Sequence, residues 1–227
     1  MARTMKTRAT STDEKYLKRS QILSAARELF LRDDRQLPAV ASIAQQAGLA
    51  KGTVYLYFST KEEIFLALLA DEFSGLLFAI QAHLERHTRT PHKRLSKAQK
   101  QDFSAGLITV IADYLLEHPE FLRLDAMSYS VLEQNLSDDF LYAFKFELTK
   151  TLVATGQQLD QIIDAPDGRG TSLLLRTYAL MRGLWQSLDY PEHLQKLLAH
   201  AMFEPIRPDF QSELRVTLQE YWTGALG

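Results

Sequence analysis

Residues 40–58 read Val40-Ala-Ser-Ile-Ala-Gln-Gln-Ala-Gly-Leu-Ala-Lys-Gly-Thr-Val-Tyr-Leu-Tyr-Phe58, and this stretch decides the fold of the N-terminal region. Its apolar residues recur at intervals of three and four, which predicts two short helices, about Val40–Ala47 and Lys51–Tyr57. Between them, Gly48 supplies the positive φ that a tight turn needs. The pattern therefore predicts a helix-turn-helix between Ala39 and Phe58.

The two predicted helices have distinct buried and exposed sides. One set of apolar residues is spaced to form a core with the preceding helix: Ile22, Ala26, Leu29, Phe30, Ile43, Leu49, Val54 and Phe58. The second helix is left with an exposed set of cationic, hydroxyl and phenol groups without a carboxylate: Lys51, Gly52, Thr53, Tyr55 and Tyr57. A surface that meets DNA phosphates and base edges requires such donors. A plain helical hairpin with a glycine cap is the alternative interpretation.

The composition is ordinary for a globular chain. Of the 227 residues, 46% are apolar, 24% are charged and none is cysteine, which excludes a disulfide framework and cysteine-ligated zinc. We see no secretory signal and no apolar run of roughly 18–20 residues, so we expect a cytoplasmic protein without membrane contact. The chain has a net charge of −2, but residues 1–60 carry ten Lys/Arg against five Asp/Glu. This basic N-terminal segment suits a polyanionic partner.

Helical periodicity continues to the C-terminus, and we find no strand pattern. A helix from Glu62 to His87, with Ser59 and Thr60 as candidate N-caps, is roughly 40 Å long at about 1.5 Å per residue. After a polar loop over Thr88–Lys100, the pattern predicts helices at Asp102–His118, Pro119–Leu132, Ser137–Ile163, Thr171–Leu188, Glu192–Phe203 and Asp209–Trp222.

Three motifs resemble the DNA-binding domain of the TetR family of bacterial transcriptional regulators. They are Ile22-Leu-x-Ala-Ala-x-x-Leu-Phe30, Ile43-Ala-x-x-Ala-Gly48 and Lys51-Gly-Thr-Val-Tyr-Leu-Tyr-Phe58-x-x-Lys61-Glu-Glu. The resemblance covers roughly residues 16–75 and implies that Lys51–Tyr57 is a recognition helix in the major groove. By the same resemblance, Lys51, Gly52 and Tyr55 would approach bases or the adjacent backbone. Phosphate contacts would come from Thr53, Tyr57 and Lys61.

One position departs from the family pattern. Members usually place Thr or Ser where this chain has Pro38-Ala39, so the hydroxyl that would cap the first helix of the motif is missing. Arg3, Lys6 and Arg8 form a basic arm that could reach a neighbouring minor groove, although a disordered tail is the interpretation we favour.

The sequence predicts an all-α fold with a three-helix DNA-binding domain and a larger helical domain. We expect a flexible basic arm over 1–15, the helix-turn-helix domain over 16–75, and a ligand-binding and dimerisation domain over 76–227. The function that this organisation predicts is a homodimeric repressor that a small, largely hydrophobic ligand releases from a palindromic double-stranded operator.

The C-terminal domain offers candidate residues for dimerisation and for ligand binding. Two helices have broad apolar faces, and in the resembling family the equivalent helices form a four-helix bundle across a two-fold axis. We expect dimer contacts from Leu174, Tyr178, Met181, Trp185, Leu214, Leu218 and Trp222. Aromatic and Met side chains could line an apolar cavity, although each is also a candidate core residue: Phe73, Tyr114, Phe121, Met127, Tyr142, Phe146 and Trp185.

Two other classes of protein remain open. An enzyme would need a catalytic constellation, and the spacing of His83, His87 and His92 is the nearest to a metal site. These histidines lack the glutamate partner of a metalloprotease motif, and no phosphate loop or nucleophile elbow is present. We therefore expect no catalytic residue, no metal and no cofactor. A helical adaptor that uses the motif for protein contacts is the remaining alternative.

Overall fold

The computed structural model describes residues 2–32, 36–87 and 95–227, with side chains from residue 13 onward except that of Asn135. Within these ranges every regular element is a helix, which confirms the predicted all-α class. Among the described helices, none combines the length and the hydropathy that a membrane span requires. The chain forms two compact units, one comprising the residues up to Asp71 with Arg123–Tyr142, and the other Glu72–Leu122 with Ala143–Gly227.

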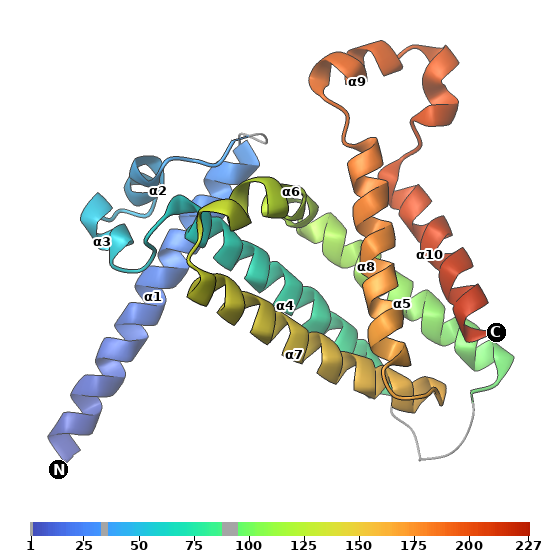
Figure 1. Ribbon diagram of the computed structural model, residues 1–227, viewed down its shortest axis with the longest axis horizontal. Helices are drawn as coiled ribbons and strands as arrows, with labels where there is room; N and C mark the ends of the chain where they lie inside the picture. Colours follow the sequence, from blue (N-terminus) through green and yellow to red (C-terminus); the bar gives the residue numbers. More distant parts are fainter. Residues whose placement is uncertain (1, 33–35, 88–94) are drawn as a thin grey trace. The chain divides into compact units, whose positions relative to one another are not determined.

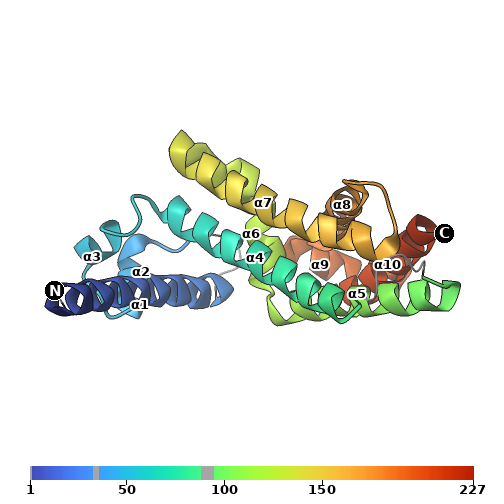
Figure 2. The same cartoon turned by 90° about the horizontal axis from the view of Figure 1, so that it is seen from below.

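The first unit is built around helix α1 (Ala2–Arg32). Helices α2 (Val40–Gln46) and α3 (Lys51–Tyr55) lie side by side, and α2 packs against α1 (Figures 1 and 2). The core of this unit contains the apolar residues that the spacing selected, and they are almost completely buried: Ile22, Ala26, Phe30, Ile43, Val54 and Phe58. Leu29 and Leu49 are half-buried.

Helix α1 begins earlier than expected. We predicted a flexible arm over residues 1–15, but the helix runs from Ala2 without a break. The reason is local, because residues 2–32 contain neither Gly nor Pro, the two residues that interrupt helices most strongly. The side chains of Arg3, Lys6 and Arg8 lie outside the described residues, so their predicted minor-groove role stays a prediction.

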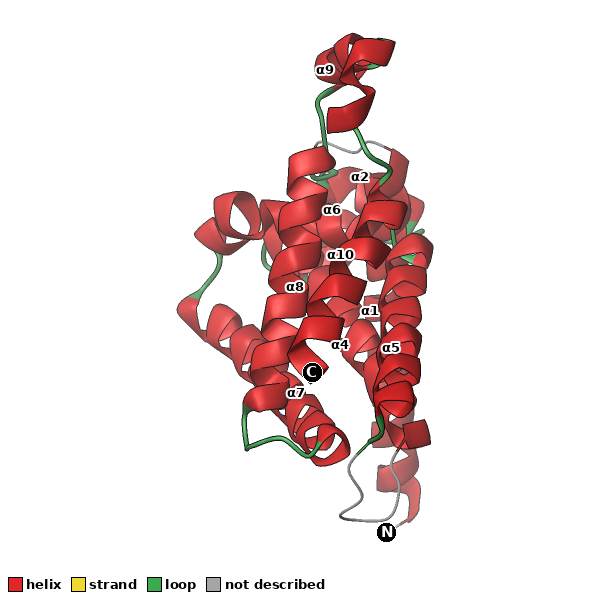
Figure 3. Cartoon of the chain, turned by 90° about the vertical axis from the view of Figure 1, so that its right-hand side faces the viewer, coloured by secondary structure: helices red, strands yellow, loops and turns green. Residues whose placement is uncertain are grey.

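The second unit contains most of the remaining helices. Helix α4 (Lys61–His87) contributes its part after Asp71, and α10 (Phe210–Leu226) packs against both α5 (Lys97–Glu117) and α8 (Arg169–Leu188), as Figures 1 and 3 show. The other elements of the C-terminal half are α6 (Glu120–Met127), a π-helical turn (Ser128–Leu132), a 3₁₀ turn (Glu133–Asn135), α7 (Asp138–Ile163), α9 (Glu192–Leu198) and a second 3₁₀ segment, η3 (Ala201–Ile206).

The helix boundaries follow from the capping residues. Ser137 accepts a hydrogen bond from the backbone N–H of Phe140 and begins α7, as predicted. Helix α5 starts at Lys97 instead of Asp102, because Ser96 and Gln99 form a capping box. This places Lys97 and Lys100 in a helix, while residues 88–94 of the predicted loop, including His92, lie outside the described residues. The predicted helix over Glu192–Phe203 is divided into α9 and η3, which project together beyond α8 and α10 (Figure 1).

Candidate nucleic-acid interface

The turn between α2 and α3 has the geometry that its glycine predicts. Gly48 has a φ of +67°, in the left-handed region. Its N–H donates to the carbonyl of Gln45 at 3.1 Å, and the N–H of Leu49 donates to that of Ala44 at 2.9 Å. This pair of bonds is the Schellman arrangement, which ends one helix and redirects the chain. The turn therefore fixes the direction in which α3 leaves α2.

Helix α3 presents the predicted polar side chains to solvent. Lys51, Gly52 and Tyr55 are exposed, Thr53 and Tyr57 are half-buried, and Val54 is fully buried in the core of the first unit. Because Val54 is anchored, the opposite side of this short helix must point outward. The structure thus gathers the five predicted residues on one segment, with Tyr57 just beyond the end of the helix at Tyr55.

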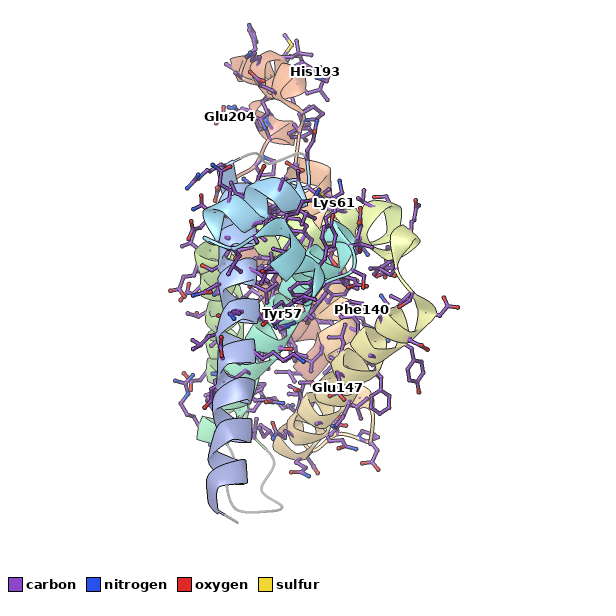
Figure 4. All side chains as sticks on the ribbon, turned by 90° about the vertical axis from the view of Figure 1, so that its left-hand side faces the viewer. Tyr57, Lys61, Phe140, Glu147, His193 and Glu204 are labelled. Carbon is purple, nitrogen blue, oxygen red and sulfur yellow. The ribbon has the colours of Figure 1, made fainter. Side chains whose placement is uncertain are left out.

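The start of α4 completes this surface with Lys61. Thr60 accepts a hydrogen bond from the backbone N–H of Glu63 at 3.1 Å, and the Glu63 carboxylate accepts one from the N–H of Ser59 at 2.6 Å. These reciprocal bonds resemble a capping box and hold Lys61 in the first turn of the helix. Lys61 is half-buried, and Figure 4 labels it together with Tyr57.

The electrostatics of the segment favour an anionic partner. Residues 36–61 include no Asp or Glu. The ammonium group of Lys51 lies 5.8 Å from the centroid of the Tyr55 ring, and the guanidinium of Arg19 lies 5.5 Å from the Phe58 ring. On α1, Lys18 donates a hydrogen bond to the Glu14 carboxylate, which raises the pKa of this lysine. Cations thus border the α2–α3 segment, while no carboxylate of its own opposes an anion.

The predicted departure at Pro38-Ala39 is present in the structure. Ala39 is the N-cap of α2 and makes no side-chain cap hydrogen bond, and the same holds for Ala50 at the start of α3. One exposed residue of the motif was missed by the sequence reasoning. Leu56 is apolar but 80% exposed. The signal that could have identified it is the burial of Val54 and Phe58 on either side, which leaves Leu56 facing outward.

The predicted ligand-pocket residues are only partly brought together. In the second unit, the Phe73 ring packs edge-on against Phe121, with centroids 4.9 Å apart, and also against Tyr178 at 5.6 Å. The Tyr114 ring lies 6.3 Å from Phe121. Trp185 is half-buried and belongs to the same unit.

Two of the other predicted pocket residues need correction, whereas the role of Met127 stays a prediction. Tyr142 and Phe146 are 71% and 52% exposed on α7, so they do not line an enclosed cavity within the chain. Met127 and Tyr142 belong to the first unit, whereas Phe73 and Phe121 belong to the second. Exposed aromatic residues on an amphipathic helix have the same spacing as buried ones, which is why the pattern could not separate the two.

Most of the predicted dimer residues lie inside their own chain. Five of the seven are buried inside their own chain: Leu174, Met181, Leu214, Leu218 and Trp222. Tyr178 contacts Phe73, and Trp185 is half-buried. The outward sides of α8 and α10 carry other residues, among them Leu175, Ala179 and Gly183 on α8 and Val216 and Thr223 on α10. The five buried residues therefore lie on the inward, more apolar side of each helix, whereas the dimer role of Tyr178 and Trp185 stays a prediction.

The helical fold and its turn geometry define a helix-turn-helix protein with a larger helical unit after the motif. Two family models match the chain: "Bacterial regulatory proteins, tetR family" over residues 22–68, and "Tetracyclin repressor-like, C-terminal domain" over residues 81–227. The second match covers more than half of the chain. The chain belongs to the TetR family, which confirms the resemblance, and the family groups it with transcriptional regulators and not with enzymes.

Individual relatives support the same assignment over parts of their length. The fatty acid metabolism regulator protein of Bacillus subtilis is 31% identical over 91 residues, 40% of this chain and 46% of that protein. The transcriptional activator FasR of Mycolicibacterium smegmatis is 27% identical over 118 residues, 52% of this chain and 46% of that protein. The chain thus spans a little under half the length of both relatives.

A solved structure extends the similarity of the fold to nearly the whole chain. The regulator FadR of Bacillus subtilis, solved in complex with stearoyl-CoA, superposes with a TM-score of 0.53 at 17% identity, covering 91% of this chain and 98% of that one. At this level of identity the likeness concerns the fold alone.

Proposed function

We propose that this protein is a homodimeric transcriptional regulator that binds a double-stranded palindromic operator through α2 and α3. The observation that carries the proposal is the exposed segment Lys51–Tyr57, held by a Schellman turn and a buried Val54 in a stretch without carboxylates. Lys51, Gly52 and Tyr55 would approach bases or the adjacent backbone. Thr53, Tyr57 and Lys61 would hold phosphates, which position the helix without reading sequence.

Substitution of Tyr55 tests this proposal. Fluorescence anisotropy with a duplex from the region upstream of the protein's own gene should show specific, salt-sensitive binding that Tyr55→Ala weakens. Tyr55→Phe removes the hydroxyl and keeps the ring, so it distinguishes the contribution of the hydroxyl to binding from that of the ring. Tyr142→Ala is the matched control, because Tyr142 is also an exposed tyrosine but lies outside the motif. Equal binding by Tyr55→Ala and Tyr142→Ala, or no binding by the unchanged protein, would favour an adaptor or an enzyme instead.

We propose that dimerisation uses the outward sides of α8 and α10. The two helices pack against each other, and residues on the side of each helix away from the core are exposed, among them Leu175 and Val216. Gly183 and Gly224, one on each helix, have no atom within 4 Å of the position that a Cβ would occupy. Small residues of this kind allow helices of two subunits to approach closely. A dimer would present two recognition helices to the two half-sites of an operator.

We propose that the effector carries a long apolar chain, of the fatty acyl type. The support comes from Bacillus subtilis, where a relative is named for fatty acid metabolism and the similar structure of FadR was solved with stearoyl-CoA. Within this chain, the rings of Phe73, Phe121 and Tyr178 form an apolar cluster between α4, the start of α6 and α8. Such a cluster suits a hydrocarbon chain better than a charged group.

The ligand proposal has a direct test on the operator complex. Stearoyl-CoA should weaken operator affinity by about 5–150-fold, the usual range of allosteric coupling, whereas free coenzyme A should not. Replacement of Phe73 by Ala should reduce the response to stearoyl-CoA while leaving operator affinity in its absence unchanged. A complex that no acyl chain length affects would refute this proposal and leave the DNA-binding proposal standing.

We propose that the protein represses transcription by occupying its operator. A deletion strain should then express the controlled gene at a higher level than the parent. Because FasR is named as an activator, lower expression in the deletion strain would assign the opposite mode. Operator binding itself would not be affected by this outcome.

A further inference from the structure

Three ionisable side chains converge in the second unit at the junction of α5 and α6. Glu72 comes from α4, whereas His118 and Glu120 stand on either side of Pro119. Each can place one ligand atom so that all three atoms lie within 4.8 Å of one another. Glu72 and Glu120 are 1% and 2% exposed, and the His118 side chain is 27% exposed. The two carboxylates of the cluster are therefore buried, and the cluster is accessible to solvent on the side of His118.

The backbone explains why these residues meet. Pro119 cannot continue α5, so His118 leaves the helix as its C-cap with a φ of −122° and a ψ of 66°. The N–H of Phe121 then donates to the carbonyl of His118 at 3.1 Å. This tight junction places Glu120 in the first turn of α6, two residues after His118. The α4 helix brings Glu72 to the same place.

Tyr114 holds two members of the cluster in position. Its hydroxyl lies 3.0 Å from Glu72 Oε2 and 3.1 Å from the backbone carbonyl of Glu72. Its ring stacks on the imidazole of His118, with the centroids 4.1 Å apart and the planes within 7°. A hydrogen-bonded carboxylate and a stacked imidazole have few rotamers left, which is the preorganisation that outer-sphere residues give to metal ligands.

We propose that Glu72, His118 and Glu120 bind a divalent transition-metal cation, of which Zn²⁺ is the best match. An imidazole nitrogen with two carboxylate oxygens is a donor set that zinc uses with three protein ligands and one open position. Mg²⁺ and Ca²⁺ prefer oxygen ligands throughout, so the histidine selects against them. The 4.8 Å span must shorten by about 1 Å when a metal binds, because tetrahedral ligand atoms about 2.0–2.2 Å from one ion lie roughly 3.5 Å apart.

The cluster also has a simpler interpretation. His118 Nδ1 lies 2.8 Å from Glu72 Oε2, and this contact alone would connect α5 to α4. The convergence of Glu120 distinguishes the two roles, because it brings a third potential ligand atom within 4.8 Å of the other two. A pair between His118 and Glu72 would need only two of these atoms.

Two of the three histidines that the sequence analysis named, His83 and His87, are engaged elsewhere. His83 Nε2 lies 3.1 Å from the carbonyl of Phe103, and His87 Nδ1 lies 2.9 Å from the carbonyl of His83. Their ring centroids are 4.4 Å apart. The sequence predicted no metal site because Glu72 is far from the His118-Pro-Glu120 segment along the chain, and only the fold brings them together.

The test is metal binding by the full-length, untagged protein. Isothermal titration with ZnCl₂ should show one ion per chain. At a free zinc concentration of about 100 times Kd, the thermal midpoint should rise by about 5–10 °C. CoCl₂ should give a visible absorption band that zinc removes. MgCl₂ at the same concentration should leave the midpoint unchanged, and an equal rise with magnesium would overturn the transition-metal assignment.

Uncharged glutamine variants locate the site. Glu72→Gln, Glu120→Gln and His118→Gln should each abolish the cobalt band and the zinc-induced rise. Glu117→Gln is the matched control, because this exposed glutamate adjoins His118 but is not in the cluster. Circular dichroism of the metal-free variants verifies that each remains helical. Unchanged cobalt spectra in all three variants, or no zinc binding by the unchanged protein, would overturn the proposal without affecting the DNA-binding function.

Discussion

The carboxylate of Asp160, near the end of α7, accepts a hydrogen bond from the backbone N–H of Gly168 at 2.8 Å. Its other oxygen accepts one from the N–H of Gly170. Asp160 is 5% exposed. One buried side chain thus ties the loop over residues 165–170 to α7 and provides partners for N–H groups at the start of α8, which would otherwise lack them.

Replacement of Asp160 by Ala should therefore destabilise the fold. Two backbone donors would lose a charged acceptor, at a cost of about 1.5–3 kcal/mol for each charge-assisted bond that water does not replace. Urea unfolding followed by circular dichroism measures the change. Asp167→Ala is the control, because Asp167 is an exposed aspartate of the same loop. If the two variants were equally stable, Asp160 would have no role in holding the loop.

Glycine substitutions in the helix-turn-helix should have opposite effects on stability. Gly48→Ala places a Cβ on a residue with positive φ and should cost about 1–2 kcal/mol. Gly52→Ala should be neutral or stabilise by up to about 1 kcal/mol, because Gly52 is helical and open space surrounds its Cβ position. Thermal unfolding of the two variants compares them directly. A loss of stability in Gly52→Ala alone would contradict the turn geometry.

The helix-turn-helix was predictable because its signals are local. Gly48, Ser137 and Pro119 each act on the backbone within a few residues, so the sequence locates the end of α2, the start of α7 and the end of α5 closely. The buried or exposed state of α3 residues was predictable for the same reason. In a helix of five residues, the anchoring of Val54 leaves one outward side.

The C-terminal faces were not predictable because they depend on distant partners. Helix α8 is apolar on more than one side, and only its packing on α10 shows that Leu174 and Met181 face inward while Leu175 faces outward. The assignment of residues 123–142 to the first unit likewise follows from contacts made far along the chain. The Asp160 bonds and the Glu72 cluster have no sequence pattern of their own, since each joins separate helices.

Removal of the Lys51 charge should reduce the salt dependence of DNA binding. If Lys51 contacts a phosphate, Lys51→Ala lowers the magnitude of the slope of log K against log salt by about 1. Anisotropy titrations between about 50 and 200 mM salt, the range over which such slopes are resolved, give the slope. Lys150→Ala, an exposed lysine on α7, should leave it unchanged. If Lys51→Ala and Lys150→Ala had the same slope of log K against log salt, Lys51 would not contact a phosphate.

Charge on the outward sides of α8 and α10 should dissociate the dimer. Leu175→Glu and Val216→Glu place a carboxylate in the proposed interface, where it would be buried without a partner. Light scattering after size exclusion should then report the monomer mass, and operator affinity should fall because both half-sites are no longer bound together. Leu116→Glu and Val153→Glu are the controls, since these residues are exposed on α5 and α7. Dimers that persist in both interface variants would place the contact on another surface.

The buried His83 should make the fold less stable in mild acid. Burial lowers the pKa of His83 below its usual range, and the nearby His87 and Arg86 lower it further, whereas the bond to the Phe103 carbonyl raises it. Below about pH 6.5, the usual value for histidine, the unfolded chain binds a proton that the folded chain does not. The free energy of unfolding therefore falls as the pH decreases from about 6.5 to the lower pKa of the folded state.

Comparison of His83→Gln with His193→Gln isolates this contribution. The glutamine amide keeps a donor for the Phe103 carbonyl but does not titrate. Urea unfolding of His83→Gln between about pH 7.5 and 5, a window of roughly one unit either side of the usual histidine pKa, should therefore show a shallower loss of stability than the unchanged protein. His193 is exposed on α9, and its replacement should preserve the original slope. The slope decides the outcome, because a general destabilisation by His83→Gln would lower the whole curve without changing its pH dependence. Identical slopes in all three proteins would mean that His83 takes up its proton equally in the folded and unfolded chains.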